Sequence, residues 1–204
     1  MNVQEATTRR LPDLKGRYLP ENCRETINTI LKETYGYEQF RNLEIYDDLS
    51  KGKEKLCISQ GQLIENVILE AEKAWKGETQ VDNILLTAPT GSGKSLLFQL
   101  PAIYLGKEYN LLTIVVSPLK ALIVDQVESL QELGYMRVAY ASSDLSPEQK
   151  MEVYRQVREG EIDLFYLSPE LLLSYDIKHF VGERRIGLVV VDEAHTVTTW
   201  GKEF

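Results

Sequence analysis

The sequence contains few of the residues on which several protein classes depend. Only two of its 204 residues are cysteines, Cys23 and Cys57, too few for a disulfide framework or a zinc cluster. No apolar run approaches the roughly 18 residues that cross a bilayer. The opening MNVQEATTRR also lacks the apolar stretch of a secretory signal. We therefore expect no membrane partner, reduced thiols and a cytoplasmic protein.

Basic residues are also scarce relative to acidic ones. The chain has 23 lysines and arginines against 31 aspartates and glutamates, which gives a formal net charge of −8. This balance argues against a protein that coats nucleic acid through bulk charge, although a local basic or aromatic strip stays open. With 43% hydrophobic and 26% charged residues, the composition is that of a globular domain rather than a disordered or collagen-like chain.

Short apolar runs alternate with helical periodicity over most of the chain. The predicted strands are Ile84–Thr87, Leu112–Ser117, Arg137–Tyr140, Asp163–Leu167 and Leu188–Val191. An amphipathic helix begins at Ser59, and helices follow at roughly 94–105, 120–133 and 147–158. Because apolar runs without polar alternation suit strands covered on both faces, the pattern predicts an α/β domain with a mostly parallel sheet flanked by helices. Ligands of such sheets bind at the carboxyl ends of the strands.

Three parts are predicted along the chain. Residues 1–20 are polar and read as a flexible N-terminal arm. Residues 21–58 form a helical extension, with a helix that ends at Gly36 and a charged stretch over 42–58 that suits a solvated loop or short helices. Residues 59–204 form the α/β lobe.

A glycine-rich loop, APTGSGKS, follows the first predicted strand and opens a helix. Gly91 and Gly93 allow backbone N–H groups to surround phosphate oxygens, and the helix directs its positive dipole end at the anion. Lys94 supplies a cation for the terminal phosphates, and the Ser95 hydroxyl is placed to bind Mg²⁺. The first position of the general pattern is glycine, whereas here it is Ala88. A glycine-rich turn that merely caps a helix is the alternative.

The last predicted strand ends in an acidic sequence, DEAH. Asp192 at a strand tip can hold Mg²⁺, and Glu193 can orient and deprotonate an attacking water. His195 could sense the terminal phosphate or relay to a neighbouring domain. The alternative is an acidic helix start capped by aspartate. The other histidine, His179, is expected to be a surface or packing residue.

Several linked blocks resemble the RecQ family of superfamily 2 DNA helicases. TAPTGSGKS and VVVDEAH resemble the first RecA-like domain of the superfamily, a P-loop NTPase fold. VVSPLKALIVDQVESLQELG, FYLSPELL, DEAHTVTTWGKEF and LKETYGYEQFR resemble RecQ blocks in the same order, over roughly residues 27–204. The resemblance implies an ATP-dependent DNA helicase that uses ATP and Mg²⁺, binds single-stranded or tailed duplex DNA and is associated with the nucleoid when in use. It leaves the pathway open between repair, recombination and defence.

The resemblance also assigns roles by position. The nucleotide contacts would be Thr90, Gly91, Ser92, Gly93, Lys94 and Ser95 at the phosphates and Tyr37, Arg41 and Gln62 at the adenine. The catalytic residues would be Lys94, Asp192, Glu193 and His195, with Ser95 and Asp192 on the metal. The nucleic-acid contacts would be Ser117, Pro118, Lys120, Ser168, Pro169, Trp200 and Phe204. Packing against the sheet edge is the alternative for Trp200 and Phe204.

Two departures from the family pattern bear on function. The FR and GQ elements are almost adjacent in the family, but here residues 42–60 separate Arg41 from Gly61, and Gln39 becomes a rival to Gln62. The aromatic-rich loop also has Thr196, Thr199 and Lys202 where the family more often has Cys, Gln and His.

The resemblance leaves the mode of action open. We expect the lobe to be incomplete at its C-terminus, a second RecA-like lobe to lie outside this sequence, and the fragment alone not to unwind DNA. With that second lobe, ATP hydrolysis would drive 3′–5′ translocation and unwinding. The alternatives are a nucleotide-gated DNA translocase or clamp and an RNA helicase.

Overall fold

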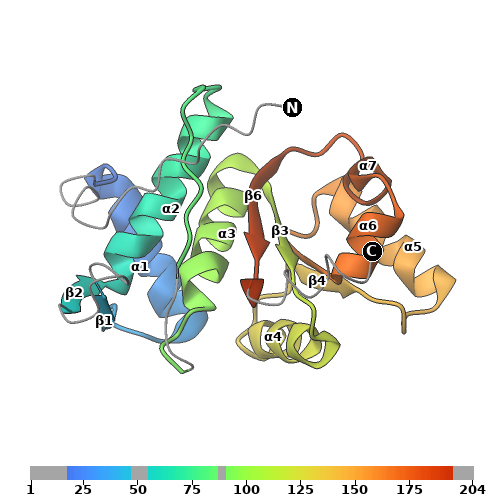
Figure 1. Cartoon of the computed structure of the whole chain (residues 1–204), viewed down its shortest axis with the longest axis horizontal. Helices are drawn as coiled ribbons and strands as arrows, with labels where there is room; N and C mark the ends of the chain where they lie inside the picture. The colour runs from blue at the N-terminus through green and yellow to red at the C-terminus, as the bar shows by residue number, and fades with distance from the viewer. Residues whose placement is uncertain (1–17, 47–54, 87–90, 195–204) are drawn as a thin grey trace. The chain divides into compact units, whose positions relative to one another are not determined.

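The computed structural model describes residues 18–46, 55–86 and 91–194 (Figure 1). The chain forms two compact units, Met1–Pro101 and Ala102–Phe204. Most of the predicted N-terminal arm, residues 1–17, lies outside the described residues. None of the helices in the described ranges has both the length and the apolar character of a membrane span.

Two helices organise the first unit. Helix α1 (Glu21–Tyr35) buries Ile27, Ile30 and Leu31 and ends at Gly36, whose φ of 70° is the left-handed conformation that glycine adopts without strain. Helix α2 (Gln60–Trp75) begins after Ser59, whose hydroxyl accepts a hydrogen bond from the Gly61 amide at 3.2 Å. Both helices were predicted from their apolar spacing.

A β-hairpin stands where a loop or short helices were predicted. Strands β1 (Asn42–Tyr46) and β2 (Lys55–Ser59) pair antiparallel, with Asn42 opposite Ser59 and Leu43 opposite Ile58. Leu43 and Ile58 are both buried. The prediction was wrong because NLEIY and KLCIS each have apolar residues at every second position over only five residues, too short a pattern to indicate a strand without its pairing partner.

The strand predicted at Ile84–Thr87 is not formed over its described part. Residues 81–86 have no regular structure, and Ile84 and Leu85 are 45% and 81% exposed. An apolar run becomes a strand only when a neighbouring strand satisfies its backbone hydrogen bonds, and a short run cannot by itself specify that neighbour.

The second unit contains the predicted parallel sheet. Its four strands lie in the order β4-β5-β3-β6, and all neighbouring pairs are parallel. The strands are β3 (Leu112–Val116), β4 (Val138–Ala141), β5 (Leu164–Leu167) and β6 (Ile186–Val191). The helices are α4 (Lys120–Glu132), α5 (Pro147–Glu159), α6 (Pro169–Ser174) and α7 (Ile177–Val181), while α3 (Leu96–Tyr109) crosses the boundary between the units. The α/β class with helices flanking a parallel sheet is confirmed, and α6 and α7 were not predicted.

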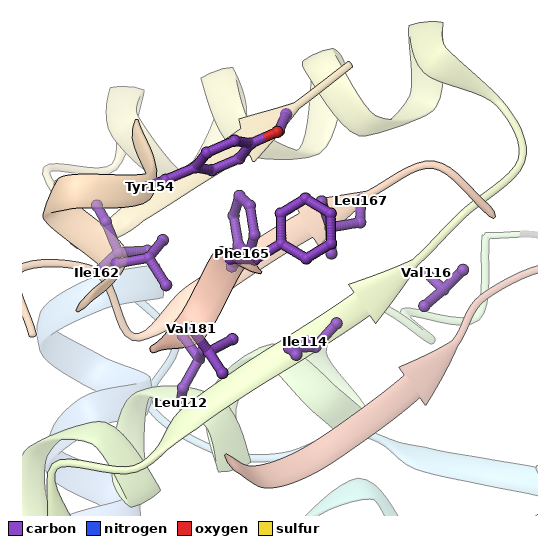
Figure 2. Close-up of a cluster of buried hydrophobic side chains, with 11 residues drawn as sticks. Leu112, Ile114, Val116, Tyr154, Ile162, Phe165, Leu167 and Val181 are labelled. Carbon is purple, nitrogen blue, oxygen red and sulfur yellow. The ribbon is translucent and has the colours of Figure 1, made fainter. Parts of the chain in front are cut away.

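One face of this sheet carries a cluster of buried apolar side chains. Side chains from alternate positions of β3 and β5 meet residues of α5 and α7 there, and the Phe165 ring of β5 meets the Tyr154 ring of α5 edge-on (Figure 2). The opposite face holds Tyr166 and is covered by α4, because Tyr166 bonds to Gln126 of that helix. Strands β3 and β5 are buried on both faces as predicted. Strand β6 is not buried on both faces, since Val189 and Val191 are 58% and 46% exposed. It is an edge strand of the four-stranded sheet.

A buried ionic cluster joins the amino ends of the strands. Asp163, which is 2% exposed, accepts hydrogen bonds from Arg137 at 2.7 and 2.9 Å, from Arg184 at 3.1 Å and from the Tyr135 hydroxyl at 3.0 Å. The hydrogen bonds with Asp163 raise the pKa of Arg137, whereas burial lowers the pKa of Arg184. Removal of the Asp163 charge would therefore leave the Arg184 guanidinium buried without its counterion.

Asp163→Asn tests this cluster while preserving side-chain volume. We expect it to lower the free energy of unfolding by about 3 kcal/mol, because breaking a buried pair leaves an uncompensated charge. Denaturant titration followed by circular dichroism measures the change. The control is Glu161→Gln, which removes a half-exposed partner of Arg155 and should have a far smaller effect. Equal effects of the two variants would contradict the assignment.

Candidate functional site

The described part of the glycine-rich loop has the backbone that phosphate binding requires. Gly91 and Gly93 both have φ of 79°, in the left-handed region that disfavours a side chain. Amides of the following turn bond back to Lys94 and Ser95, and α3 begins at Leu96, two residues later than predicted. The Ser92 hydroxyl is buried and has no hydrogen-bond partner in the described part of the chain. Thr90 and Ala88 lie outside the described residues.

Gln60, which was not among the predicted site residues, connects this loop to the upstream segment. Its side-chain amide donates to the carbonyl oxygens of Ser92 and Gly93 at 3.3 and 3.5 Å. Its side-chain oxygen accepts from the Arg41 amide at 3.2 Å, and its own backbone amide donates to the Arg41 carbonyl at 2.9 Å. Gln60 is 3% exposed. The only sequence signal for it was its place directly before the GQ pair.

The hairpin explains how the 42–60 insertion is accommodated. Because Asn42 pairs with Ser59, the chain leaves at Arg41 and returns at Gln60, and these two residues are hydrogen-bonded. The FR and GQ elements are thus side by side in space although they are separated in sequence. The Phe40 ring packs so close to Gly61 that a β-carbon there would lie 2.6 Å from it.

The residues predicted at the adenine lie within this same unit. The Arg41 guanidinium carbon lies 5.7 Å from the centre of the Tyr37 ring, and Tyr37 in turn stacks on Tyr35 at 6.4 Å. Tyr37 is 47% exposed, so part of its ring can receive a further planar group. Gln62 instead borders a cavity of about 410 Å³, together with Arg24 and Phe40. Gln39 is exposed.

The acidic pair lies at the carboxyl end of β6, in the second unit. The Asp192 amide donates to the Val116 carbonyl at 2.9 Å, which extends the pairing of β6 with β3. Both Asp192 carboxylate oxygens accept hydrogen bonds, Oδ1 from the Glu193 amide at 3.0 Å and Oδ2 from Gln126 at 3.2 Å. Glu193 has φ of 50°, a strained value for a residue with a side chain and one that recurs at functional sites. His195 lies outside the described residues.

The loops predicted to contact nucleic acid differ in exposure. Ser117 is fully buried, Ser168 is 4% exposed and caps α6, and Pro169 is buried. Pro118 is half-buried. The Lys120 side chain is 46% exposed and pairs with Asp144 at 3.0 Å. The contact of all these residues with nucleic acid stays a prediction.

Trp200 and Phe204, predicted to contact nucleic acid, lie outside the described residues. His179, expected to be a surface or packing residue, stacks on Tyr175 at 4.7 Å and meets the Tyr154 ring edge-on at 5.4 Å. It therefore packs among aromatic rings of the second unit.

Gly93→Ala tests the contact between the loop and Gln60. A β-carbon at position 93 would lie 2.7 Å from the Gln60 side-chain nitrogen, which donates to the Ser92 and Gly93 carbonyls while the Gln60 oxygen accepts from the Arg41 amide. Gly77→Ala is a matched control, because Gly77 has φ of 80° and no atom within 4 Å of a β-carbon. Both variants should lose about 1 kcal/mol of stability to backbone strain, and Gly93→Ala about 1 kcal/mol more from displaced hydrogen bonds. Denaturant titration measures both, and an equal loss would show that Gln60 does not constrain the loop.

Comparison with known proteins places these features in a family. The sequence profile of the DEAD/DEAH box helicases matches residues 62–204. The chain is 30% identical over 179 residues to an ATP-dependent DNA helicase RecQ of Haemophilus influenzae, covering 88% of this chain and 24% of the relative. It is 33% identical over 183 residues to an ATP-dependent DNA helicase RecQ of Synechocystis, covering 89% and 32%. The chain thus spans a third or less of the length of these relatives.

A solved structure shares the fold. The structure of a DUF1998 helicase, MrfA, bound to DNA and AMPPNP superposes with a TM-score of 0.53 at 22% identity and covers 88% of this chain and 22% of that one. At this identity the match supports the RecA-like α/β fold. The glycine loop, the acidic strand end and the profile match over more than half of the residues agree, and this chain belongs to the DEAD/DEAH box helicase family, with RecQ helicases among its relatives.

Proposed function

We propose that this chain is the ATP-binding lobe of a RecQ-like DNA helicase. The observation that carries the proposal is the left-handed backbone at Gly91 and Gly93, held by Gln60, in a chain that the DEAD/DEAH profile matches. The RecQ relatives are named ATP-dependent DNA helicases, and this chain aligns with 24% and 32% of their length.

The residues of the loop suit a nucleotide phosphate chain. Gly91 and Gly93 have positive φ and no β-carbon, so phosphate oxygens can approach the backbone amides of the loop. The buried Ser92 hydroxyl has no partner among the described residues. The start of a 14-residue helix directly after the loop adds a favourable dipole. Thr90 and residues 91–95 would hold the phosphates, with Lys94 neutralising their charge.

The acidic pair suits a divalent cation. Asp192 presents a carboxylate whose direction is fixed by two hydrogen bonds, and Ser95 offers a hydroxyl, both oxygen ligands of the type that Mg²⁺ prefers. Mg²⁺ would neutralise charge that develops on the terminal phosphate. Glu193 would orient the attacking water and take its proton, and His195 would respond to the terminal phosphate.

The upstream residues suit an adenine ring. Tyr37 and Arg41 already form one cation–π pair, and a base would add a planar partner. Gln62 has the donor and acceptor atoms to distinguish adenine from guanine. The hairpin closure supports this assignment, because it brings Arg41 to the start of α2, where Gln62 lies.

DNA would bind at the loops that follow the strands. Lys120 has an exposed cation, and Trp200 and Phe204 supply aromatic rings on which bases stack without sequence preference. Together with a second RecA-like lobe, the chain would couple ATP hydrolysis to 3′–5′ movement on single-stranded DNA and to unwinding, in repair or recombination. We place this activity in the cytoplasm, at the nucleoid.

Lys94→Ala should abolish ATP hydrolysis by the full-length protein, because the terminal phosphates lose their cation. Release of inorganic phosphate from ATP in the presence of single-stranded DNA measures this directly. Lys107→Ala, a lysine in the last turn of α3, is the control and should keep wild-type turnover. Hydrolysis that survives Lys94→Ala would refute the proposal.

Trp200→Ala should reduce the ratio of DNA-stimulated to basal ATPase activity, because a base loses its stacking partner. One lost stacking contact corresponds to about 1–3 kcal/mol of binding. The measurement is ATPase rate against single-stranded DNA concentration, and an unchanged ratio would show that Trp200 does not contact DNA.

Strand displacement on tailed DNA and RNA duplexes separates a DNA helicase from a non-unwinding clamp and from an RNA helicase.

Gln62→Ala should reduce the preference for ATP over GTP, since the amide no longer reads the edge of the base. The ratio of kcat/KM for the two nucleotides measures this preference. Equal use of both nucleotides by the wild-type protein would exclude an adenine-reading role for Gln62.

A further inference from the structure

Asp192 is oriented by a residue that lies outside the phosphate loop and the acidic sequence. The Glu193 amide occupies one carboxylate oxygen, and the other accepts from the side-chain amide of Gln126 at 3.2 Å. Gln126 lies on α4, 66 residues earlier in the chain, and is 8% exposed. A hydrogen bond to a carboxylate is stronger than one between neutral groups and fixes the direction of the acceptor.

Strand register explains how these residues meet. Tyr166 of β5 is paired with Val115 of β3, which is paired with Val190 of β6. Because side chains alternate between the faces of a sheet, Asp192, two residues beyond Val190, follows on the face that carries Tyr166. This is the face that α4 covers.

Tyr166 determines which way the Gln126 amide points. Its hydroxyl, on a side chain that is fully buried, donates to the Gln126 oxygen at 3.0 Å. With the oxygen engaged there, the amide nitrogen is directed at Asp192, which as a carboxylate can only accept. The three side chains therefore form one directional chain, from Tyr166 through Gln126 to Asp192.

We propose that Gln126 is a positioning residue that holds the Asp192 carboxylate in the orientation needed to bind a divalent cation with the nucleotide, and that Tyr166 fixes the Gln126 amide for this task. The inference rests on the proposed nucleotide site. A residue that orients a metal ligand in this way contributes to metal affinity although it never touches the ion.

Binding of fluorescent mant-ATP to the full-length protein, titrated with MgCl₂ and repeated in EDTA, tests the inference without relying on turnover. Gln126→Leu should raise the MgCl₂ concentration for half-maximal binding about tenfold, the usual size of an outer-shell effect. Binding in EDTA should stay at the wild-type level, because the phosphate loop is unaltered. Tyr166→Phe removes only the hydroxyl and should act in the same direction with smaller size.

The double variant separates a shared pathway from general loosening of the fold. Because Tyr166 acts through Gln126, adding Tyr166→Phe to Gln126→Leu should change the MgCl₂ dependence no further. Gln131→Leu, the same substitution at a more exposed position of α4, is the matched control and should leave the dependence at wild type.

Two results would overturn the inference. One is a wild-type MgCl₂ dependence in folded Gln126→Leu, or in Tyr166→Phe alone if Gln126→Leu does not fold by circular dichroism. The other is an additive effect in the double variant. Failure of the proposed function is distinct, because the wild-type protein would then bind no mant-ATP, or Lys94→Ala would bind it equally well.

Discussion

Asp163 places a negative charge in the interior at the amino ends of the parallel strands, where two arginines and a tyrosine hydroxyl donate to it. Its backbone also bonds to Thr113 and Arg137, so one residue joins the starts of β3, β4 and β5. Arg184, just before β6, completes the connection. The opposite, carboxyl edge of the same sheet is the edge at which ligands of parallel α/β sheets bind.

The carboxyl edge is where the second unit presents its candidate chemistry. Ser117, Ser142, Ser168 and Asp192 each follow a strand there. Their side chains are far from equivalent, since the serines are buried and Asp192 is partly exposed. Helix α4 packs over one face and carries Gln126 to Asp192, so the same helix covers apolar surface and directs a carboxylate. The apolar cluster on the other face packs the strands together in their register.

The first unit shows how a family site can accommodate extra residues. An antiparallel hairpin begins and ends at neighbouring points, so an insertion of this kind leaves its flanking residues in contact. Gln60 then serves both sides, since its backbone and side chain bond to Arg41 while its amide reaches the loop at Ser92 and Gly93. The hairpin thus leaves Arg41 connected to the glycine-rich loop through Gln60.

Periodicity and motif spacing alone predicted the parallel sheet, five of the helices, the glycine loop and the acidic strand end, because these depend on local patterns of side chains and backbone freedom. The sequence could not predict the hairpin, whose strands exist only through their mutual pairing, nor the missing strand at Ile84–Leu86. It also could not identify Gln60 or Gln126, since each acts on residues far away in the chain. Only the tertiary structure brings such partners within hydrogen-bonding distance, because a buried amide is defined by the groups around it and not by its neighbours in sequence.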